Sequence, residues 1–576
     1  MTQERLYLYD TTLRDGQQTQ GVQFSTAEKL HIVQMLDALG VDYIEGGWPG
    51  ANPTDSAFFE QCPPTKATLS AFGMTKRAGR SAGNDDILAQ VVNAGTDAIC
   101  LVGKSHLFHV KTALNISPQE NLDNIAHSIH HLRAQGREIL FDAEHFFDGF
   151  RDNPDYALAT LQAAYQGGAR WVVLCDTNGG SLPHDIHRAT QAAIAAGVPP
   201  EHLGIHAHND CEQAVANSLA AVEAGARQIQ GTLNGLGERC GNANLITLIG
   251  ILALKEPYAS RYKTRIGPAE LGKLTRTSRR LDDILNRLPA KQAAFVGSSA
   301  FAHKAGLHAS AILKHPATYE HIEPALVGNA RVIPMSNQAG RSNLRNWLNE
   351  VGIQGADETA LDDILTQVKQ REAEGYSYDS ARASFELLAR RALGLLPRFF
   401  EVERHRVRVE GKQDAEGRIK TMSKALVIVK IGGIRRLSVS ESADSQESDN
   451  QGMNKQGEDR GPVNALYRAL AKNMGPYQSV IHDFRLVDFK VRITQGGTEA
   501  ITRVIIDSAD SKGRRWSTVG VDANIVAASL EALLDAINWK LLHEGAPPAV
   551  QVQAQGQAPL LSPLIRLGKA GPYSAD

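Results

Sequence analysis

Two histidines separated by one residue, His206 and His208, are the sharpest chemical signal in the sequence. On a β-strand, residues i and i+2 point to the same face, so both imidazoles would enter one site. Two histidines and a carboxylate can hold a divalent cation and leave positions open for a substrate. By itself the spacing fits a structural or an exposed histidine pair equally well. Asp15 and Asn242, which follow the first and last strands of the pattern described below, shift the balance towards a metal site.

Three more polar side chains stand where they could act on a substrate beside that cation. Arg14 precedes Asp15, and its planar guanidinium suits a carboxylate or a developing enolate oxygen. Glu144 could orient or deprotonate a substrate, or simply form an ion pair with Arg14. Thr177 offers a hydroxyl to an anion, although a threonine in a strand-end turn often caps the next helix.

A second cluster, Phe301–His308 followed by Tyr319, contains two histidines and a tyrosine further along the chain. His308 and Tyr319 could supply an acid or a base, since histidine titrates near neutral pH. Residue types alone favour the alternative, a helix N-terminal loop with ordinary packing histidines.

The residues around His206 and His208 lie in a region where predicted strands and helices alternate regularly. Short apolar runs alternate with stretches of helical periodicity, of which the best marked begins at the capping box Ser25–Glu28 and stops at Gly40. Eight such alternations predict a (β/α)8 TIM barrel, with an open α/β sheet as the alternative. In a barrel the active site lies at the carboxyl ends of the strands, where the polar residues gather. The predicted strands are Leu6–Leu13, Val41–Gly46, Ala67–Phe72, Ala98–Val102, Glu138–Asp142, Trp171–Asp176, Leu203–Ala207 and Gln228–Leu233.

The rest of the chain predicts a helical extension and a C-terminal α+β domain. We place the barrel at residues 1–280, the extension at 281–398 and the α+β domain at 399–545. Residues 438–461 predict a flexible insert, because they are almost without apolar residues. Residues 546–576 are rich in Pro, Gln and Ala and predict a disordered tail. The predicted helices after the barrel strands are Ile246–Leu254, Leu271–Leu285, Glu358–Arg371, Tyr378–Arg391, Leu466–Asn473 and Ile525–Leu542. The predicted strands of the last domain are Phe399–Val409, Ala425–Ile434, Leu486–Ile493 and Ala500–Asp507.

Composition excludes several function classes. The chain has 576 residues and a formal net charge of −2, so it lacks the basic surplus of a nucleic-acid-binding protein. No apolar run reaches the roughly 20 residues of a membrane span, and Met1–Asp10 does not resemble a signal peptide. Five cysteines without CxxC spacing predict reduced thiols and a cytoplasmic location.

Four motifs together resemble one family, the metal-dependent acyl-CoA-condensing barrel enzymes that include the 2-isopropylmalate, homocitrate and citramalate synthases. These motifs are Arg14-Asp-Gly-x-Gln18, His206-x-His208-Asn-Asp, Gly237-Glu-Arg-x-Gly-Asn242 and His303-Lys-Ala-Gly-x-His308. Within the family, Glu45-Gly-Gly-Trp48 and Cys175-Asp-Thr-Asn-Gly-Gly180 look most like the citramalate synthases. The resemblance runs from about residue 5 to about residue 545.

The resemblance implies a mechanism. Mg²⁺ or Mn²⁺ would be held by Asp15, His206, His208 and Asn242, and Arg14, Gln18 and Thr177 would bind the 2-oxo acid. Arg14 would stabilise the developing oxyanion, while Glu144 and His308, supported by Tyr319, move the proton of acetyl-CoA. The residues of the extension come from the partner protomer in relatives, so a homodimer is implied. With pyruvate as acceptor, hydrolysis of the thioester would release (R)-citramalate and CoA for isoleucine synthesis.

The C-terminal domain resembles the regulatory domain of the same family, which implies feedback inhibition, here by isoleucine. A purely structural dimerisation domain is the alternative. The other functions that we weigh are a 2-isopropylmalate or homocitrate synthase, a lyase of the hydroxymethylglutaryl-CoA type, and a non-catalytic amino-acid sensor.

Overall fold

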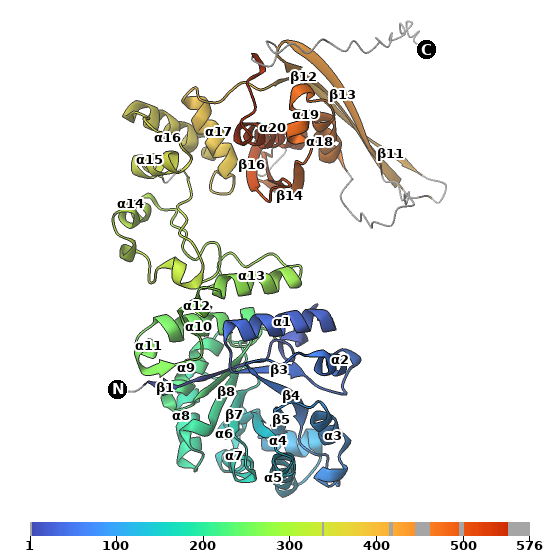
Figure 1. The fold of residues 1–576 in the computed structure, drawn as a ribbon, viewed down its shortest axis with the longest axis vertical. Helices are drawn as coiled ribbons and strands as arrows, with labels where there is room; N and C mark the ends of the chain where they lie inside the picture. The colour runs from blue at the N-terminus through green and yellow to red at the C-terminus, as the bar shows by residue number, and fades with distance from the viewer. Residues whose placement is uncertain are drawn as a thin grey trace. The chain divides into compact units, whose positions relative to one another are not determined.

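The structure is a computed structural model that describes residues 3–336, 339–413, 417, 419–443, 461–494 and 500–550. The chain divides into two compact units, which are described separately. The first comprises residues 1–302 and 320–332, and the second comprises residues 303–319 and 333–576. Figure 1 colours both by residue number.

The first unit is built around a closed barrel of eight parallel strands, β2 to β9. Strands β2 and β9 pair with each other and close the ring, with Tyr7 opposite Gln228. All eight predicted strands are present, and the closed ring confirms the TIM barrel over the open sheet. The strands are Tyr7–Asp10 (β2), Tyr43–Gly47 (β3), Thr68–Met74 (β4), Ala98–Lys104 (β5), Glu138–Glu144 (β6), Trp171–Asp176 (β7), Leu203–Ala207 (β8) and Gln228–Gly231 (β9).

Helices cover the outside of the barrel (Figure 1). The predicted capping box is present: Ser25 Oγ accepts from Glu28 N, Glu28 accepts from Ser25 N, and Gly40 ends the helix at a φ of 93°. Glycine adopts this left-handed conformation without the Cβ clash that other residues meet. The main helices are Thr26–Leu39 (α1), Pro53–Gln61 (α2), Asp86–Asn93 (α3), Pro118–Ala134 (α5), Pro154–Gly167 (α7), Pro183–Ala195 (α8), Ala214–Ala224 (α9) and Leu245–Leu254 (α10).

The barrel interior is filled at its amino end by a buried aromatic cluster that includes Tyr9, Tyr43 and Trp171. The Trp171 indole donates to Tyr43 Oη (3.2 Å), so the polar handles of the large rings find partners inside the core.

The second unit contains helices and two three-stranded antiparallel sheets. Helix α20 (Ile525–His543) packs on β16 (Arg515–Asp522), where Thr518 Oγ1 donates to Ala532 O (2.8 Å). The other strands are Glu401–Gln413 (β11), Ile419–Ile431 (β12), Ile434–Ala443 (β13), Arg485–Ile493 (β14) and Thr502–Ala509 (β15). The other main helices are Gly306–Lys314 (α14), Arg341–Glu350 (α15), Glu358–Ala373 (α16), Arg382–Ala392 (α17) and Pro462–Lys472 (α18).

The structure corrects the predicted elements at five places. The predicted strand Ala425–Ile434 is the end of β12 and the start of β13, because Gly432 and Gly433 adopt φ values of 55° and 83° and form a tight turn. Strand β13 then continues to Ala443, so the first residues of the predicted insert belong to the sheet. Strand β16 was not among the predicted strands.

The helix predicted at Leu271–Leu285 is two helices, Pro268–Leu271 (α12) and Leu274–Ile284 (α13), interrupted at Gly272. The helix predicted from Tyr378 begins only at Arg382, after a turn in which Ala381 N donates to Tyr378 O (3.3 Å).

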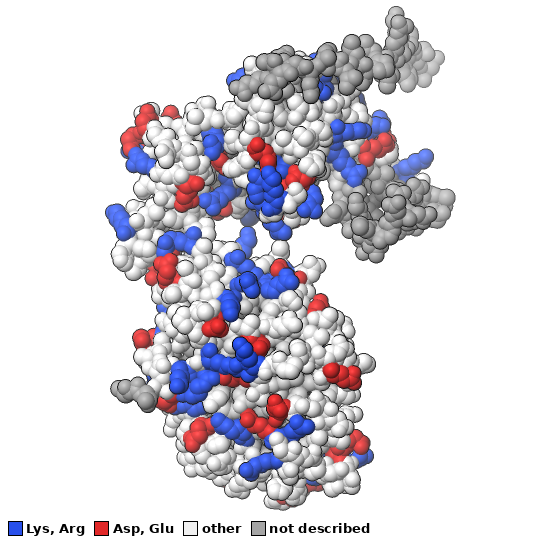
Figure 2. Space-filling view, in the orientation of Figure 1, with Lys and Arg blue, Asp and Glu red and all other residues white. Residues whose placement is uncertain are grey.

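Parts of the predicted insert and tail, residues 444–460 and 551–576, lie outside the described residues. The described start of the predicted tail contacts the preceding domain, because Ala549 N donates to Arg398 O (3.0 Å). Within the described ranges, no helix combines the length and apolar character that crossing a bilayer requires. Figure 2 shows basic and acidic side chains interspersed on the visible face of the first unit.

Candidate active site at the mouth of the barrel

A cavity of about 420 Å³ opens at the carboxyl ends of the barrel strands. Its lining contains charged side chains on one part and apolar side chains, mainly Trp48, Phe72 and Val102, on another. Its lining includes all but one of the barrel residues that the sequence assigned to a site, Arg14, Asp15, Gln18, Glu144, Thr177, His206 and His208, together with Gln17, Trp48, Asn52, Asp55, Phe72, Val102, Asp142, Cys175, Glu238 and Arg239.

Asp15, His206 and His208 all line this cavity and lie close together. Asp15 Oδ2 is 3.1 Å from His206 Nε2 and 3.9 Å from His208 Nε2, and all three residues are buried. One ligand atom from each lies within 4.8 Å of the others, a spacing that a divalent cation can bridge. This group could therefore hold a metal ion.

Asn242, the remaining predicted ligand, is buried beside this group. It forms a β-bridge with His208, and its Nδ2 donates to Leu236 O (3.1 Å). Its Oδ1 is buried and, among the described residues, has no hydrogen-bond partner. A buried carbonyl oxygen without a partner is costly, and coordination of a hard cation would satisfy it. The donor set therefore fits a divalent cation.

Arg14 is held by Glu45, a partner that sequence reasoning did not identify. Arg14 Nε donates to Glu45 Oε2 (2.6 Å), while the Tyr9 hydroxyl donates to the other carboxylate oxygen (2.8 Å). The Arg14 guanidinium also stacks on the Phe72 ring, with its central carbon 4.0 Å from the ring centroid. The available signal was the position of Glu45 at the end of a predicted strand, in the quoted motif before Trp48.

Charged groups around the proposed cation position shift the pKa values of Asp15 and His208. Burial raises the pKa of Asp15, but the charge of Arg14 and the hydrogen bond of His206 outweigh it and hold that pKa well below its usual range. Burial and neighbouring His206 lower the pKa of His208 to about 4. An ionised Asp15 and a neutral His208 are the protonation states that metal binding requires. Burial lowers the pKa of His206, but the hydrogen bond and the charge of Asp15 outweigh burial and raise that pKa.

Glu144 and Thr177 both line the cavity. The sequence left open that Glu144 pairs with Arg14 and that Thr177 caps a helix, and the structure shows other partners for both. Glu144 forms an ion pair with Lys104 rather than with Arg14. Thr177 does not cap a helix: its Oγ1 accepts from His145 N (2.8 Å), which leaves its hydroxyl hydrogen free to donate. Gln18 is exposed at the rim, whereas the buried Oε1 of neighbouring Gln17 has no partner in the described part of the chain.

The apolar wall of the cavity comes from three consecutive strands. Trp48 follows β3, Phe72 lies on β4 and Val102 lies on β5. The Trp48 and Phe72 rings meet edge to face with centroids 5.5 Å apart. Sequence reasoning could not identify this wall, because the three residues are far apart in the chain.

His308 and Tyr319 belong to the second unit and lie against each other. Their rings stack with centroids 4.0 Å apart, and both side chains are exposed. His308 lies in the first turn of α14, which begins at Gly306, so the cluster does stand at a helix N-terminus.

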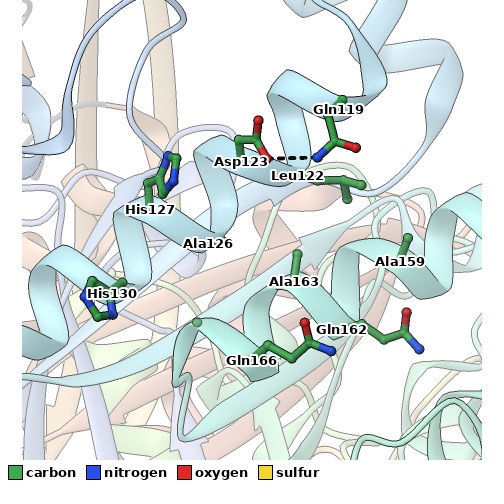
Figure 3. Close-up of a pocket in the computed structure, with 11 residues that line it drawn as sticks. Gln119, Leu122, Asp123, Ala126, His127, His130, Ala159, Gln162, Ala163 and Gln166 are labelled. Carbon is green, nitrogen blue, oxygen red and sulfur yellow. Dashed lines mark hydrogen bonds between the residues drawn. The ribbon is translucent and has the colours of Figure 1, made fainter.

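A second hollow, of about 470 Å³, lies outside the barrel between α5 and α7 (Figure 3). Its floor is made of small residues such as Ala126, Ala163 and Gly167, and His127 and His130 stand beside it on α5. It contains none of the residues predicted for the site and lies on helix surfaces rather than at strand ends.

Comparison with family models divides the chain into three consecutive regions. Residues 5–277 match the HMGL-like family, residues 295–375 match the homocitrate synthase post-HMGL domain-like family, and residues 379–541 match the LeuA allosteric (dimerisation) domain. The barrel and the C-terminal α+β domain thus correspond to separate family models.

Similar proteins match nearly the whole chain. An (R)-citramalate synthase of Aquifex aeolicus is 43% identical over 94% of this chain and 98% of its own length. An (R)-citramalate synthase of Synechocystis is 46% identical over 93% of this chain and 96% of its own length. A 2-isopropylmalate synthase of Methanocaldococcus jannaschii is 30% identical over 93% of this chain and 94% of its own length. With its HMGL-like barrel and LeuA domain in this order, the chain belongs to the family of the (R)-citramalate synthases.

Proposed function

We propose that this protein is an (R)-citramalate synthase, which condenses acetyl-CoA with pyruvate and hydrolyses the thioester to release citramalate and CoA. The observation that carries the proposal is the buried group Asp15, His206 and His208 beside Arg14, in a cavity with one apolar wall. The match of (R)-citramalate synthases to nearly the whole chain supports the same function. The reaction belongs to isoleucine biosynthesis.

Asp15, His206, His208 and Asn242 would hold Mg²⁺ or Mn²⁺. When bound, the cation acts as a Lewis acid on the ketone of the 2-oxo acid. The buried carboxylate, the two imidazoles and the unpartnered Asn242 carbonyl oxygen are ligands suited to it.

Arg14, Gln18 and Thr177 would bind the acceptor. Glu45 holds the Arg14 guanidinium in place (2.6 Å), so that it can stabilise the ketone oxygen as negative charge develops there. The free hydroxyl hydrogen of Thr177 is suited to the acceptor carboxylate. Glu144, which lines the same cavity, would take the proton from the methyl group of acetyl-CoA.

His308 and Tyr319 would complete the site from the partner protomer of a homodimer. Their stacked and exposed rings are available to a second surface. The LeuA allosteric (dimerisation) domain supports dimer formation and allosteric regulation, and we propose isoleucine as the inhibitor. We also propose domain limits of 1–280, 281–398 and 399–545 and a cytoplasmic location for the protein.

Pyruvate is the acceptor that the apolar wall favours. Trp48, Phe72 and Val102 line the same cavity as the charged groups, and we propose that they contact the substituent of the 2-oxo acid. Bulky aromatic rings reject a branched substituent by overlap, which discriminates more strongly than the loss of a few favourable contacts.

The test is CoA release from acetyl-CoA with pyruvate, 2-oxoisovalerate or 2-oxoglutarate as acceptor. We expect pyruvate to have the highest kcat/KM, by at least about 100-fold over 2-oxoisovalerate. We expect Trp48→Ala to narrow that ratio by raising turnover of the larger acid. A preference of the unmodified protein for 2-oxoisovalerate or 2-oxoglutarate would contradict the proposal and identify a 2-isopropylmalate or homocitrate synthase.

A further inference from the structure

A line of three buried side chains connects strand β6 to the proposed metal ligand His206. Asp142 on β6 accepts from Gln230 Nε2 on β9 (3.0 Å). Gln230 Oε1 in turn lies 2.8 Å from His206 Nδ1 on β8. Asp142, Gln230 and His206 are 3%, 0% and 4% exposed, so water does not compete for these hydrogen bonds.

The chemistry of Asp142 determines how this line is oriented. Burial raises the pKa of Asp142 to about 6, so above that pH its carboxylate only accepts hydrogen bonds, and it already accepts one from the Cys100 thiol. The amide NH₂ of Gln230 must therefore face Asp142, which turns its oxygen towards His206. Because an amide oxygen only accepts, His206 Nδ1 must carry a hydrogen.

The orientation of Gln230 therefore decides which nitrogen of His206 can bind a cation. A neutral imidazole with hydrogen on Nδ1 has its lone pair on Nε2. His206 Nε2 is the atom that faces Asp15 Oδ2 at 3.1 Å. The line of hydrogen bonds thus presents the free lone pair to the cation position.

Two neighbouring residues show that this arrangement is specific to His206. Nδ1 of His208 is buried without a hydrogen-bond partner in the described part of the structure. Gln228 lies two residues before Gln230 on β9 and is equally buried, yet neither atom of its amide has a described partner. Gln228 therefore provides a matched control on the same strand.

We infer that Gln230 and Asp142 are positioning residues that hold His206 in the tautomer and ring orientation required for binding the divalent cation. The inference rests on the proposed metal site and adds residues that do not touch the cation themselves. Groups that hydrogen-bond to a metal-ligating histidine typically change metal affinity by about 10- to 100-fold when they are replaced.

The test measures the Kd for Mn²⁺ of the full-length protein by titration calorimetry, with the midpoint of thermal unfolding measured without metal. Gln230→Leu removes both hydrogen bonds at similar volume and should weaken Mn²⁺ binding about 10- to 100-fold. Gln228→Leu should leave the Kd unchanged, because that amide contacts neither His206 nor Asp142 by a hydrogen bond.

The double variant Gln230→Glu with Asp142→Asn separates positioning from general stability. The glutamate at position 230 still offers an oxygen that accepts from His206 Nδ1, and the net charge is unchanged. In the hydrogen bond between positions 230 and 142, the asparagine becomes the donor and the glutamate the acceptor. We expect it to bind Mn²⁺ within a few-fold of the unmodified protein, at least several-fold more tightly than Gln230→Leu.

The outcomes are distinguishable. A Gln230→Leu variant that unfolds at lower temperature but keeps the original Kd would show a structural role and overturn the inference. Equal weakening by Gln228→Leu, or no recovery in the double variant, would overturn it as well. If the unmodified protein does not bind Mn²⁺ at all, the proposed metal site itself is wrong.

Discussion

Asp10 is the last residue of strand β2 and Asp15 lies in the loop that follows, yet their surroundings move their pKa values in opposite directions. Burial raises the pKa of Asp10 to about 7. The Thr12 hydroxyl and the Thr12 backbone amide donate hydrogen bonds to this carboxyl, but they offset the effect of burial only in part. Asp15 is also buried, but the charge of Arg14 and the hydrogen bond of His206 outweigh burial and lower its pKa. The first carboxyl is suited to a structural role and the second to binding a cation.

Asp10 makes the stability of the barrel depend on pH. A folded-state pKa raised from 3.8 to about 7 means that the folded chain binds the proton more tightly than the unfolded chain. The stabilisation is complete below the unfolded pKa and is lost as the pH rises through about 7. Over this window the change is on the order of 4 kcal/mol, at about 1.4 kcal/mol for each pKa unit.

We therefore expect Asp10→Asn to become more stable relative to the unmodified protein as the pH rises from about 5 to about 8. The asparagine has no proton to lose and can still accept from Thr12. Thermal unfolding midpoints across this range measure the difference. Asp123→Asn, at an exposed position on α5, serves as the control and should show no such trend. A constant difference between Asp10→Asn and the unmodified protein would contradict the prediction.

At the scale of elements, helix α1 joins the ends of two barrel strands through one buried lysine. Lys29 is 0% exposed, and its ammonium donates to Leu13 O (2.9 Å) and Gly46 O (3.0 Å) and pairs with Asp55 on α2. Leu13 precedes Arg14, and Gly46 follows Glu45. This lysine therefore aligns the two loops whose side chains form the Arg14–Glu45 ion pair.

Removing the lysine leaves a buried carboxylate and two carbonyl oxygens without their partner. We expect Lys29→Met to lower the free energy of unfolding by about 3–5 kcal/mol, the usual cost of breaking a buried ion pair. Adding Asp55→Asn should recover part of this loss, because the unpaired charge is then removed. Urea unfolding measures both effects, and Lys66→Met at an exposed position is the control. A Lys29→Met protein as stable as the control would contradict this role.

At the scale of the whole molecule, the residues proposed for catalysis come from two compact units. The proposed metal ligands and Arg14 belong to the first unit, whereas His308 and Tyr319 belong to the second. The second unit also contains the region that matches the LeuA allosteric (dimerisation) domain. In the proposed dimer, each protomer would supply His308 and Tyr319 to the barrel of its partner.

Complementation tests the exchange between protomers. Arg14→Ala and His308→Ala should each be nearly inactive alone. After subunit exchange, an equal mixture should recover about a quarter of the original activity, because half of the dimers are mixed and each contains one intact site. If each protomer uses its own His308, the mixed dimers contain no intact site and the mixture stays inactive. Rate measurements before and after exchange distinguish the two cases.

The sequence by itself determined the barrel strands, the capping box of α1 and the gathering of polar residues at one end. These features depend on local periodicity and on residue types at short spacing, which the chain carries without reference to its fold. It determined element ends less well: Gly432 and Gly433 divide a predicted strand, and Gly272 divides a predicted helix.

Only the tertiary structure decided the partners. Arg14 pairs with Glu45 rather than Glu144, Lys29 with Asp55, and Gln230 with His206. Sequence reasoning assigned none of these pairs, because closing the barrel brings together strand ends that lie tens of residues apart in the chain. Hydrogen bonds and ion pairs depend on distances of about 3 Å, which hydrophobic periodicity does not encode. The sequence therefore specifies which chemistry is available, and the closed barrel decides which groups carry it out together.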